Sequence, residues 1–188
     1  MKILLTGATG YIGKRLLPAL IADGHHVVCC VRDRNRFEVP DGFEQQTSVI
    51  EADFLQKETL DSIPVDLDAA YYLIHSMSSS STDFEEMEAE AARNFLEALN
   101  KTQVKQVIYL GGIVNIDILS KHLESRKHVG EILESGKYLF TGLRAGIIVG
   151  SGSASFEIIR DLAEKLPVMI APKWVNTRCQ PIGIVDVI

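Results

Sequence analysis

Three glycines, spaced three residues apart, stand near the N-terminus of this 188-residue chain, in the run Thr6–Gly13. They follow an apolar segment and open an amphipathic one, which places them in a turn between a strand and a helix. Gly7 allows the tight turn, Gly10 lets the backbone approach a pyrophosphate, and Gly13 lets the helix pack against the strand. The free N–H groups at the start of the helix then bind phosphates. The run therefore predicts a dinucleotide-binding loop, rather than a turn that only serves packing, with contacts from Gly7, Thr9, Gly10, Tyr11, Ile12 and Gly13.

Two side chains of opposite charge follow the second expected strand, and they favour different dinucleotides. The guanidinium of Arg32 could form two hydrogen bonds to the 2′-phosphate of NADP, and Arg34 or Arg36 could add positive charge. Asp33 could instead hold the ribose hydroxyls of NAD, as an acidic residue at this distance past the loop does in many such sites. We predict NADP as the cofactor, with NAD as the alternative.

Polar residues also follow the third and fourth expected strands, at the carboxyl edge where open α/β sheets bind ligands. His75 and Ser76 come after the fourth strand, and we predict that His75 contacts the ribose or the nicotinamide. A histidine with a purely structural role is the alternative. Asp53 follows the third strand, where it is a candidate for cofactor binding and also stands at N-cap to N3 spacing from Gln56.

The order of the expected elements positions these residues along one edge. Short β-rich runs alternate with helical patterns, which indicates a doubly wound, mostly parallel sheet of the Rossmann type in an α/β fold. Strands are expected at 2–5, 26–31, 47–51, 69–74, 106–110 and 138–143, and helices at 10–23, 56–62, 82–99, 119–133 and 155–166. The clearest helix is 82–99, where Thr82 and Glu85 have capping-box spacing and one apolar face carries Phe84, Met87, Ala91 and Phe95.

The overall composition limits the partners of the chain. There are 19 Lys plus Arg residues against 25 Asp plus Glu residues, for a net charge of −6, so nucleic acid is not an expected partner. Three cysteines are too few for a disulfide scaffold, and no run is apolar enough for a membrane span. We therefore expect a cytoplasmic protein that binds a dinucleotide and a small-molecule substrate, with no membrane partner, and a homo-oligomer stays open. No paired CxxC or HExxH motif predicts a metal site.

The phosphate loop TGATGYIG closely resembles that of the short-chain dehydrogenase/reductase superfamily, in its extended and atypical branches. The resemblance extends through GHHVVCCVRD, EADF, YYLIHSM, VIYLGGI and LRAGIIVGSG. Together these segments look most like the nucleoside-diphosphate-sugar epimerase-like group, with kinship to the nitrogen-metabolite-repressor and complex I accessory-subunit proteins. The resemblance implies that Arg32 binds the 2′-phosphate and that Asp53 accepts a hydrogen bond from the adenine amine.

The catalytic residues of the resembled reductases are not matched here. Those enzymes use a Tyr and a Lys four residues later, together with a Ser after the fifth strand. The matching helix carries His122 and Arg126, and the serine position falls in Gly111–Gly112. None of the five tyrosines has a lysine four residues on. His122 could replace the phenol as a proton-transfer group beside Arg126, and a histidine on a basic surface is the alternative.

Two classes of function follow from the resemblance. The first is an NADP-dependent oxidoreductase or a nucleotide-sugar epimerase or dehydratase. The second is a dinucleotide-binding sensor or assembly protein without turnover, and the missing Tyr and Lys favour it by predicting weak or absent activity. We expect one NAD(P)-binding domain over residues 1–188. It should be truncated within the start of a substrate-covering region, because residues 180–188 resemble the segment that enters this region, with Asp186 placed to cap a later helix.

Overall fold

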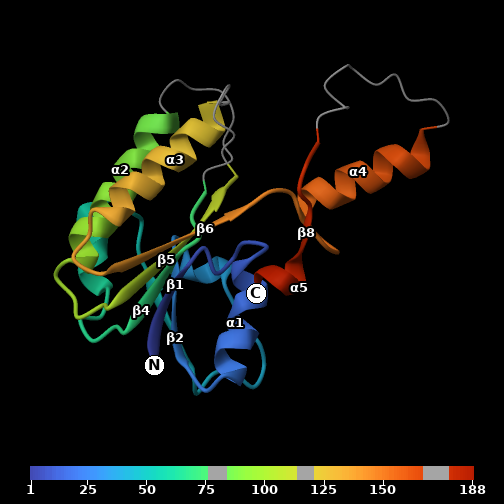
Figure 1. Ribbon diagram of the computed structural model, residues 1–188. Helices are drawn as coiled ribbons and strands as arrows, with labels where there is room; N and C mark the ends of the chain where they lie inside the picture. The colour runs from blue at the N-terminus through green and yellow to red at the C-terminus, as the bar shows by residue number, and fades with distance from the viewer. Residues whose placement is uncertain (76–83, 114–120, 167–177) are drawn as a thin grey trace. The chain divides into compact units, whose positions relative to one another are not determined.

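The computed structural model describes residues 1–75, 84–113, 121–166 and 178–188 (Figure 1). The chain falls into two compact units, Met1–Arg144 and Ala145–Ile188. The first unit contains the predicted phosphate loop and the strands that surround it. Ser76 and Thr82, both named from the sequence, lie outside the described residues.

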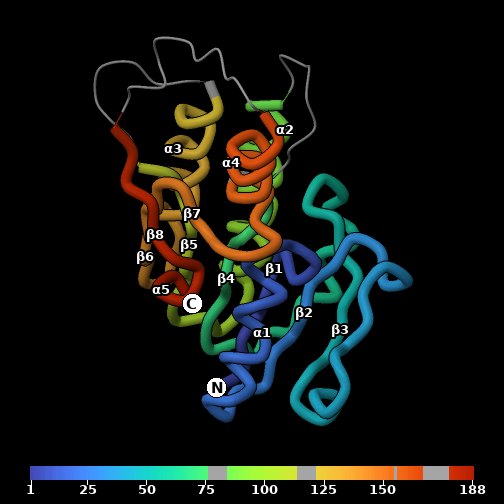
Figure 2. Tube along the Cα trace, turned by 90° about the vertical axis from the view of Figure 1, so that its right-hand side faces the viewer, coloured from blue at the N-terminus to red at the C-terminus, as the bar shows by residue number. Residues whose placement is uncertain are grey.

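The first unit is built on a six-stranded sheet with the strand order β3-β2-β1-β4-β5-β6 (Figure 2). Its strands are β1 (Lys2–Thr6), β2 (His26–Val31), β3 (Thr47–Glu51), β4 (Ala69–Tyr72), β5 (Gln106–Gly112) and β6 (Leu139–Ala145). The pairs β1–β2, β1–β4, β2–β3 and β4–β5 are parallel. The strand order reverses beside β1, which makes its carboxyl end the point where a doubly wound sheet binds ligands. The predicted α/β fold of the Rossmann type is confirmed.

Helices cover the two faces of this sheet and separate its core into two layers. Helix α1 (Gly13–Ala22) packs on β1 and β2, while α2 (Phe84–Leu99) and α3 (Lys121–Glu134) lie side by side, with α3 against β5 (Figure 1). Alternate residues of each strand enter opposite layers. Cys29 joins the apolar cluster under α1, and its neighbour Cys30 joins the cluster under α2 and α3, as their adjacent positions predict.

The strand β4 ends two residues earlier than the sequence pattern predicts. The cause is Thr6, whose hydroxyl donates to the carbonyl of Tyr71 at 2.9 Å and accepts from the amide of Leu73 at 3.0 Å. The Leu73 amide is therefore satisfied by a side chain rather than by a strand. The backbone of residues 73–75 leaves the sheet as a loop at the carboxyl edge.

The helix expected at residues 56–62 is instead a 3₁₀ helix, η2 (Lys57–Ser62). Two hydroxyls explain the tighter winding, because each one bonds to the carbonyl three residues earlier. Thr59 Oγ donates to the Gln56 carbonyl at 2.7 Å, and Ser62 Oγ donates to the Thr59 carbonyl at 2.8 Å. Side chains that bond to the local backbone in this way compete with the α-helical pattern.

The second unit contains a short parallel pair of strands and two helices. The strands are β7 (Ile148–Val149) and β8 (Ile182–Gly183), and the helices are α4 (Ala154–Lys165) and α5 (Ile184–Val187). Asp186 lies inside α5, whose N-cap is Gly183. Across the described part of both units, no helix combines the length and the apolarity needed to cross a membrane.

Candidate functional site

The glycine loop has the backbone geometry that the spacing predicts. Gly7 has a φ of +65°, and a Cβ there would stand 2.8 Å from the Leu73 carbonyl oxygen. The Gly10 amide donates to the Gly7 carbonyl at 2.9 Å and closes the turn. A Cβ on Gly13 would collide with the Gly7 carbonyl and the Ala8 backbone. The loop therefore requires glycine at Gly7 and Gly13 for its own packing.

A cavity of about 200 Å³ lies over this loop and collects most of the predicted cofactor residues. It is bounded by the ends of four strands and by Met87 and Ala91 of α2. Six predicted residues line it: Gly7, Thr9, Gly10, Arg32, Asp53 and His75. Tyr11, Ile12 and Gly13 lie in the turn that leads into α1 and are not among its lining residues, while the Arg15 guanidinium stacks 4.0 Å from the Tyr11 ring centroid.

The order of the strands spreads the lining residues along the cavity. Asp53 follows β3, Arg32 follows β2, the glycine loop follows β1, and His75 follows β4. Because these strands are neighbours in that order, Arg32 and His75 stand on opposite sides of the loop. A dinucleotide with its pyrophosphate on the loop would direct one nucleoside toward Arg32 and the other toward His75.

Arg32 and Asp33 have different surroundings. Asp33 Oδ1 accepts from the Asn35 amide at 2.9 Å and caps the 3₁₀ helix η1 (Arg34–Arg36). Arg32 is exposed and lines the cavity. Within the described ranges of the chain its guanidinium forms no hydrogen bond or ion pair. The Arg32 guanidinium is therefore open to the cavity, while the Asp33 carboxylate is bonded to the backbone. This arrangement suits the binding of an anionic group near Arg32.

The Asp53 carboxylate closes a local turn, with Oδ1 accepting from the Leu55 amide at 3.0 Å. The N-cap of η2 is Gln56, so the expected capping of a helix by Asp53 with Gln56 at N3 is wrong. The Asp53 backbone amide is held by Thr59 Oγ at 2.9 Å. These bonds fix Asp53 at the wall of the cavity that Arg32 also lines.

A buried carboxylate that sequence reasoning missed holds His75 in place. Glu88 of α2 has 7% of its surface exposed, and its Oε1 lies 2.9 Å from His75 Nδ1. Its other oxygen, Oε2, accepts from Ser125 Oγ of α3 at 2.5 Å. A signal was present in the sequence, because Glu88 lies four residues after Phe84 and three before Ala91, within the apolar face of α2. An acidic residue in such a face needs partners.

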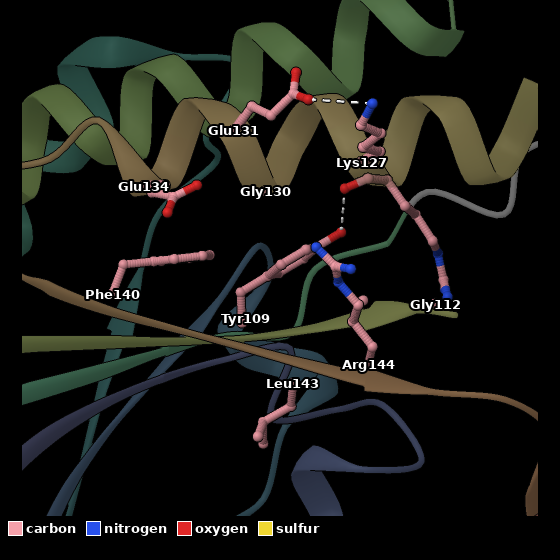
Figure 3. A pocket seen from close by; sticks show the side chains of 12 residues that line it. Tyr109, Gly112, Lys127, Gly130, Glu131, Glu134, Phe140, Leu143 and Arg144 are labelled. Atoms are coloured by element: carbon pink, nitrogen blue, oxygen red, sulfur yellow. Dashed lines mark hydrogen bonds and ion pairs between the residues drawn. The ribbon is translucent and has the colours of Figure 1, made fainter. Parts of the chain in front are cut away.

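The structure separates the two residues predicted to replace the catalytic pair. His122 is exposed at the start of α3, with its ring 5.4 Å from that of Phe84 in an edge-to-face arrangement. Arg126 instead lines a second cavity, of about 460 Å³, between α3 and the strands β5 and β6 (Figure 3). Tyr109, Gly112 and Arg144 line the same cavity. His122 is not among its lining residues.

Four phenols of the first unit, those of Tyr71, Tyr72, Tyr109 and Tyr138, have raised pKa values. Tyr109 lines the second cavity and donates to the Arg126 carbonyl at 3.0 Å (Figure 3). Burial raises the pKa of Tyr109 to about 12, although the charge of Arg126 acts in the opposite direction. Burial also raises the pKa values of Tyr71, Tyr72 and Tyr138. These four phenols thus lack the lowered pKa that favours proton exchange by a phenol near neutral pH.

Comparison with known proteins agrees with the geometry of the glycine loop. The model of the NAD(P)H-binding family matches residues 7–147. The photosystem II assembly factor Ycf39 of Synechocystis sp. is 24% identical over 109 residues, which are 58% of this chain and 33% of that protein.

Two solved structures share the fold. A nucleoside-diphosphate-sugar epimerase from Staphylococcus aureus has a TM-score of 0.65 and 23% identity, over 79% of this chain and 51% of its own. The Bordetella bronchiseptica enzyme WbmG, solved in complex with NAD, has a TM-score of 0.64 and 18% identity, over 80% of this chain and 54% of its own. This chain thus spans about half the length of these solved structures.

The family model covers the glycine loop from Gly7 onward, the strands β2 to β6 and the helices α1 to α3. This match confirms the NAD(P)-binding family indicated by the sequence motifs, and the solved structures confirm the fold. The chain belongs to the NAD(P)H-binding family.

Proposed function

We propose that this protein is an NADP(H)-dependent oxidoreductase that holds the dinucleotide across the carboxyl edge of β3, β2, β1 and β4. The observation that carries the proposal is the cavity itself, in which Gly7, Gly10, Arg32 and His75 meet. When bound, the nicotinamide supplies or accepts a hydride. The chain supplies backbone amides of the glycine loop for the pyrophosphate and the Arg32 guanidinium for the 2′-phosphate.

The preference for NADP(H) rests on the contrast between Arg32 and Asp33. A guanidinium can form two parallel hydrogen bonds to a phosphate, and Arg34 and Arg36 add positive charge on η1. Asp33 would repel a 2′-phosphate, but its Oδ1 is already bonded to the Asn35 amide. Arg32 is thus the cation at this part of the cavity, where the 2′-phosphate of the adenosine ribose would lie.

Calorimetric titration with NADPH and NADH tests this assignment. A charge-assisted hydrogen bond contributes about 1.5–3 kcal/mol, so NADPH should bind roughly 10- to 150-fold more tightly than NADH. Arg32→Ala should remove most of that preference while leaving NADH affinity unchanged. Arg160→Ala is the matched control, because Arg160 belongs to α4 and pairs there with Glu157. Equal affinities of the parent protein for NADPH and NADH would instead indicate that Asp33 binds the hydroxyls of the adenosine ribose.

A second candidate is a dinucleotide-binding sensor or assembly protein that lacks turnover. The observation in its favour is the replacement of the Tyr and Lys positions by His122 and Arg126, and the relative from Synechocystis sp. is itself an assembly factor. Both candidates require dinucleotide binding. They differ in whether a group at the nicotinamide end of the cavity can exchange a proton.

A further inference from the structure

Glu88 is a buried carboxylate that is hydrogen-bonded to His75 and Ser125. A carboxylate removed from water loses hydration, and only well-placed partners offset that loss. Both oxygens of Glu88 have such partners, at 2.9 Å from His75 Nδ1 and 2.5 Å from Ser125 Oγ. Ser125 is itself 5% exposed. The two bonds tie the loop after β4 to both helices of the same layer.

These contacts fix the orientation of the His75 ring. An ionised carboxylate only accepts hydrogen bonds, so His75 Nδ1 carries a proton and donates a hydrogen bond to Glu88. The ring of Phe84 packs against the imidazole at 6.1 Å and 83°, which restricts its rotation. Within residues 1–75, 84–113, 121–166 and 178–188, Nε2 has no hydrogen-bond partner. The imidazole is 26% exposed and lines the cavity.

The same geometry excludes a nucleophilic role for Ser125. In a Ser–His–acid triad the hydroxyl donates to the imidazole, which in turn donates to the acid. Here the Ser125 hydroxyl donates to Glu88 directly. Ser125 and His75 therefore share one acceptor, and the serine positions the carboxylate.

We propose that His75, oriented by Glu88 and Ser125, is the group that exchanges a proton with the substrate at the nicotinamide end of the cavity. The proposal rests on the proposed function, since it assumes that the adenosine end lies toward Arg32. It gives the protein a donor in place of the absent Tyr and Lys. Glu88 and Ser125 act through His75 and are positioning residues.

The reaction balances with a carbonyl compound as substrate. When bound, NADPH would supply the hydride for the carbonyl carbon and would be left as NADP⁺. The electron pair of the C=O bond moves to the oxygen, which takes the proton from His75 Nε2. The imidazolium becomes neutral and regains a proton from water, while Glu88 stabilises its charged form. In the reverse direction, neutral Nε2 accepts the proton of the alcohol.

The inference can be tested without a substrate by counting the protons that move when the dinucleotide binds. The nicotinamide ring is positively charged in NADP⁺ and neutral in NADPH, whereas the 2′-phosphate is the same in both. A positive ring beside His75 disfavours the imidazolium. Among the residues that the structure describes, the charged or titratable groups near His75 are Glu88 on α2, Arg32 and Asp53 along the cavity, and His122 behind Phe84.

The experiment is calorimetry with NADP⁺ and with NADPH in buffers of different ionisation enthalpy, between about pH 5 and 8, where histidine titrates. Binding of NADP⁺ should release more protons from the protein than binding of NADPH, with a difference of up to about one proton per site. His75→Gln should abolish the difference while both forms still bind. The matched control is His26→Gln. The ring of His26 also forms a hydrogen bond, to Ser48 Oγ at 2.8 Å, but His26 lies at the amino end of β2, away from the cavity at the carboxyl ends of the strands. The difference in proton release should persist in His26→Gln.

Several results would overturn the proposal. Equal proton counts for the two forms in the parent protein, or a difference that survives in His75→Gln, would show that no proton exchange involves this imidazole. If His75→Gln does not fold, ¹⁵N spectra of the histidines in the parent protein decide instead. His75 should carry its proton on Nδ1, and its ring signals should differ between the NADP⁺ and NADPH complexes; an unresponsive ring contradicts the inference. Failure of both nucleotides to bind the parent would overturn the proposed function itself.

Discussion

Gly10 is the residue at which cofactor binding and folding can be separated. A Cβ at this position would meet the Gly7 carbonyl oxygen at 3.1 Å, a tight contact that a small shift of the loop can relieve. The two methyls of a valine would occupy the space over the loop, where a pyrophosphate must approach the backbone. Gly10→Val should therefore weaken dinucleotide binding at least about a hundredfold, or about 2.8 kcal/mol, in a protein that still folds.

The measurement is calorimetric titration with NADPH, with circular dichroism to verify the fold. Gly10→Ala provides a graded comparison, since it adds one carbon atom and should cost less affinity than the valine. If folded Gly10→Val binds NADPH with unchanged affinity, the assignment of this loop as the pyrophosphate-binding site is wrong.

The sequence predicted the residues of the cavity better than the residues of the proton-transfer site. Gly7, Arg32 and His75 each follow a strand, so their meeting at one edge could be inferred from the element order. The contact between His75 and Glu88 joins residues 13 positions apart and depends on the angle at which α2 crosses the sheet. No local pattern encodes that angle. His122 and Arg126 share a helix, yet they face different neighbours for the same reason.

Among the elements, Asp68 connects the starts of three strands at the amino edge. Its Oδ2 accepts from the amide of Lys2, the first residue of β1, at 2.9 Å, and its Oδ1 accepts at 2.9 Å from Nζ of Lys105, which directly precedes β5. Its backbone amide and carbonyl bond to Lys2 and Lys105 as well. The Lys2 amide first, and then Lys105, hold the pKa of Asp68 below its ordinary value.

This lowered pKa predicts how stability depends on pH. The bonds of Asp68 stabilise the fold fully above the pKa of the unfolded chain, about 3.9, and the contribution is lost as the pH falls through the lower folded pKa. Asp68→Asn should therefore reduce the free energy of unfolding more at pH 7 than at about pH 3. Urea unfolding at both pH values checks this. Asp41→Asn, in an exposed loop, should show no such pH-dependent loss, and an equal loss at both pH values for Asp68→Asn would contradict the assignment.

The element boundaries that differed from prediction were set by side chains rather than by hydrophobic periodicity. Thr6 ends the pairing of β4 from the neighbouring strand, and Thr59 and Ser62 tighten η2 into a 3₁₀ helix. Periodicity reports which residues are buried, so it identified the six strands of the first unit. It does not report where a hydroxyl captures a backbone group.

At the scale of the whole molecule, the cysteines report on the integrity of the sheet. Burial raises the pKa of Cys29 and of Cys30 to about 12, and both side chains are enclosed in the core. The thiolate is the reactive form, so these two thiols should resist iodoacetamide at neutral pH. Cys179 is exposed and should be modified. Mass spectrometry should find one labelled cysteine in the native protein and three in urea; rapid native labelling of Cys29 or Cys30 would contradict this packing.

The neighbouring positions of Cys29 and Cys30 have a further consequence for following partial opening of the fold. One peptide bond separates them, yet one thiol is sealed by α1 and the other by α2 and α3. Their labelling rates thus measure two separate openings within a single tryptic fragment. If the layers detach independently, the two rates will differ and respond separately to denaturant; if the sheet opens only by global unfolding, they will coincide. The strand β2 thereby carries its own internal reference for local unfolding.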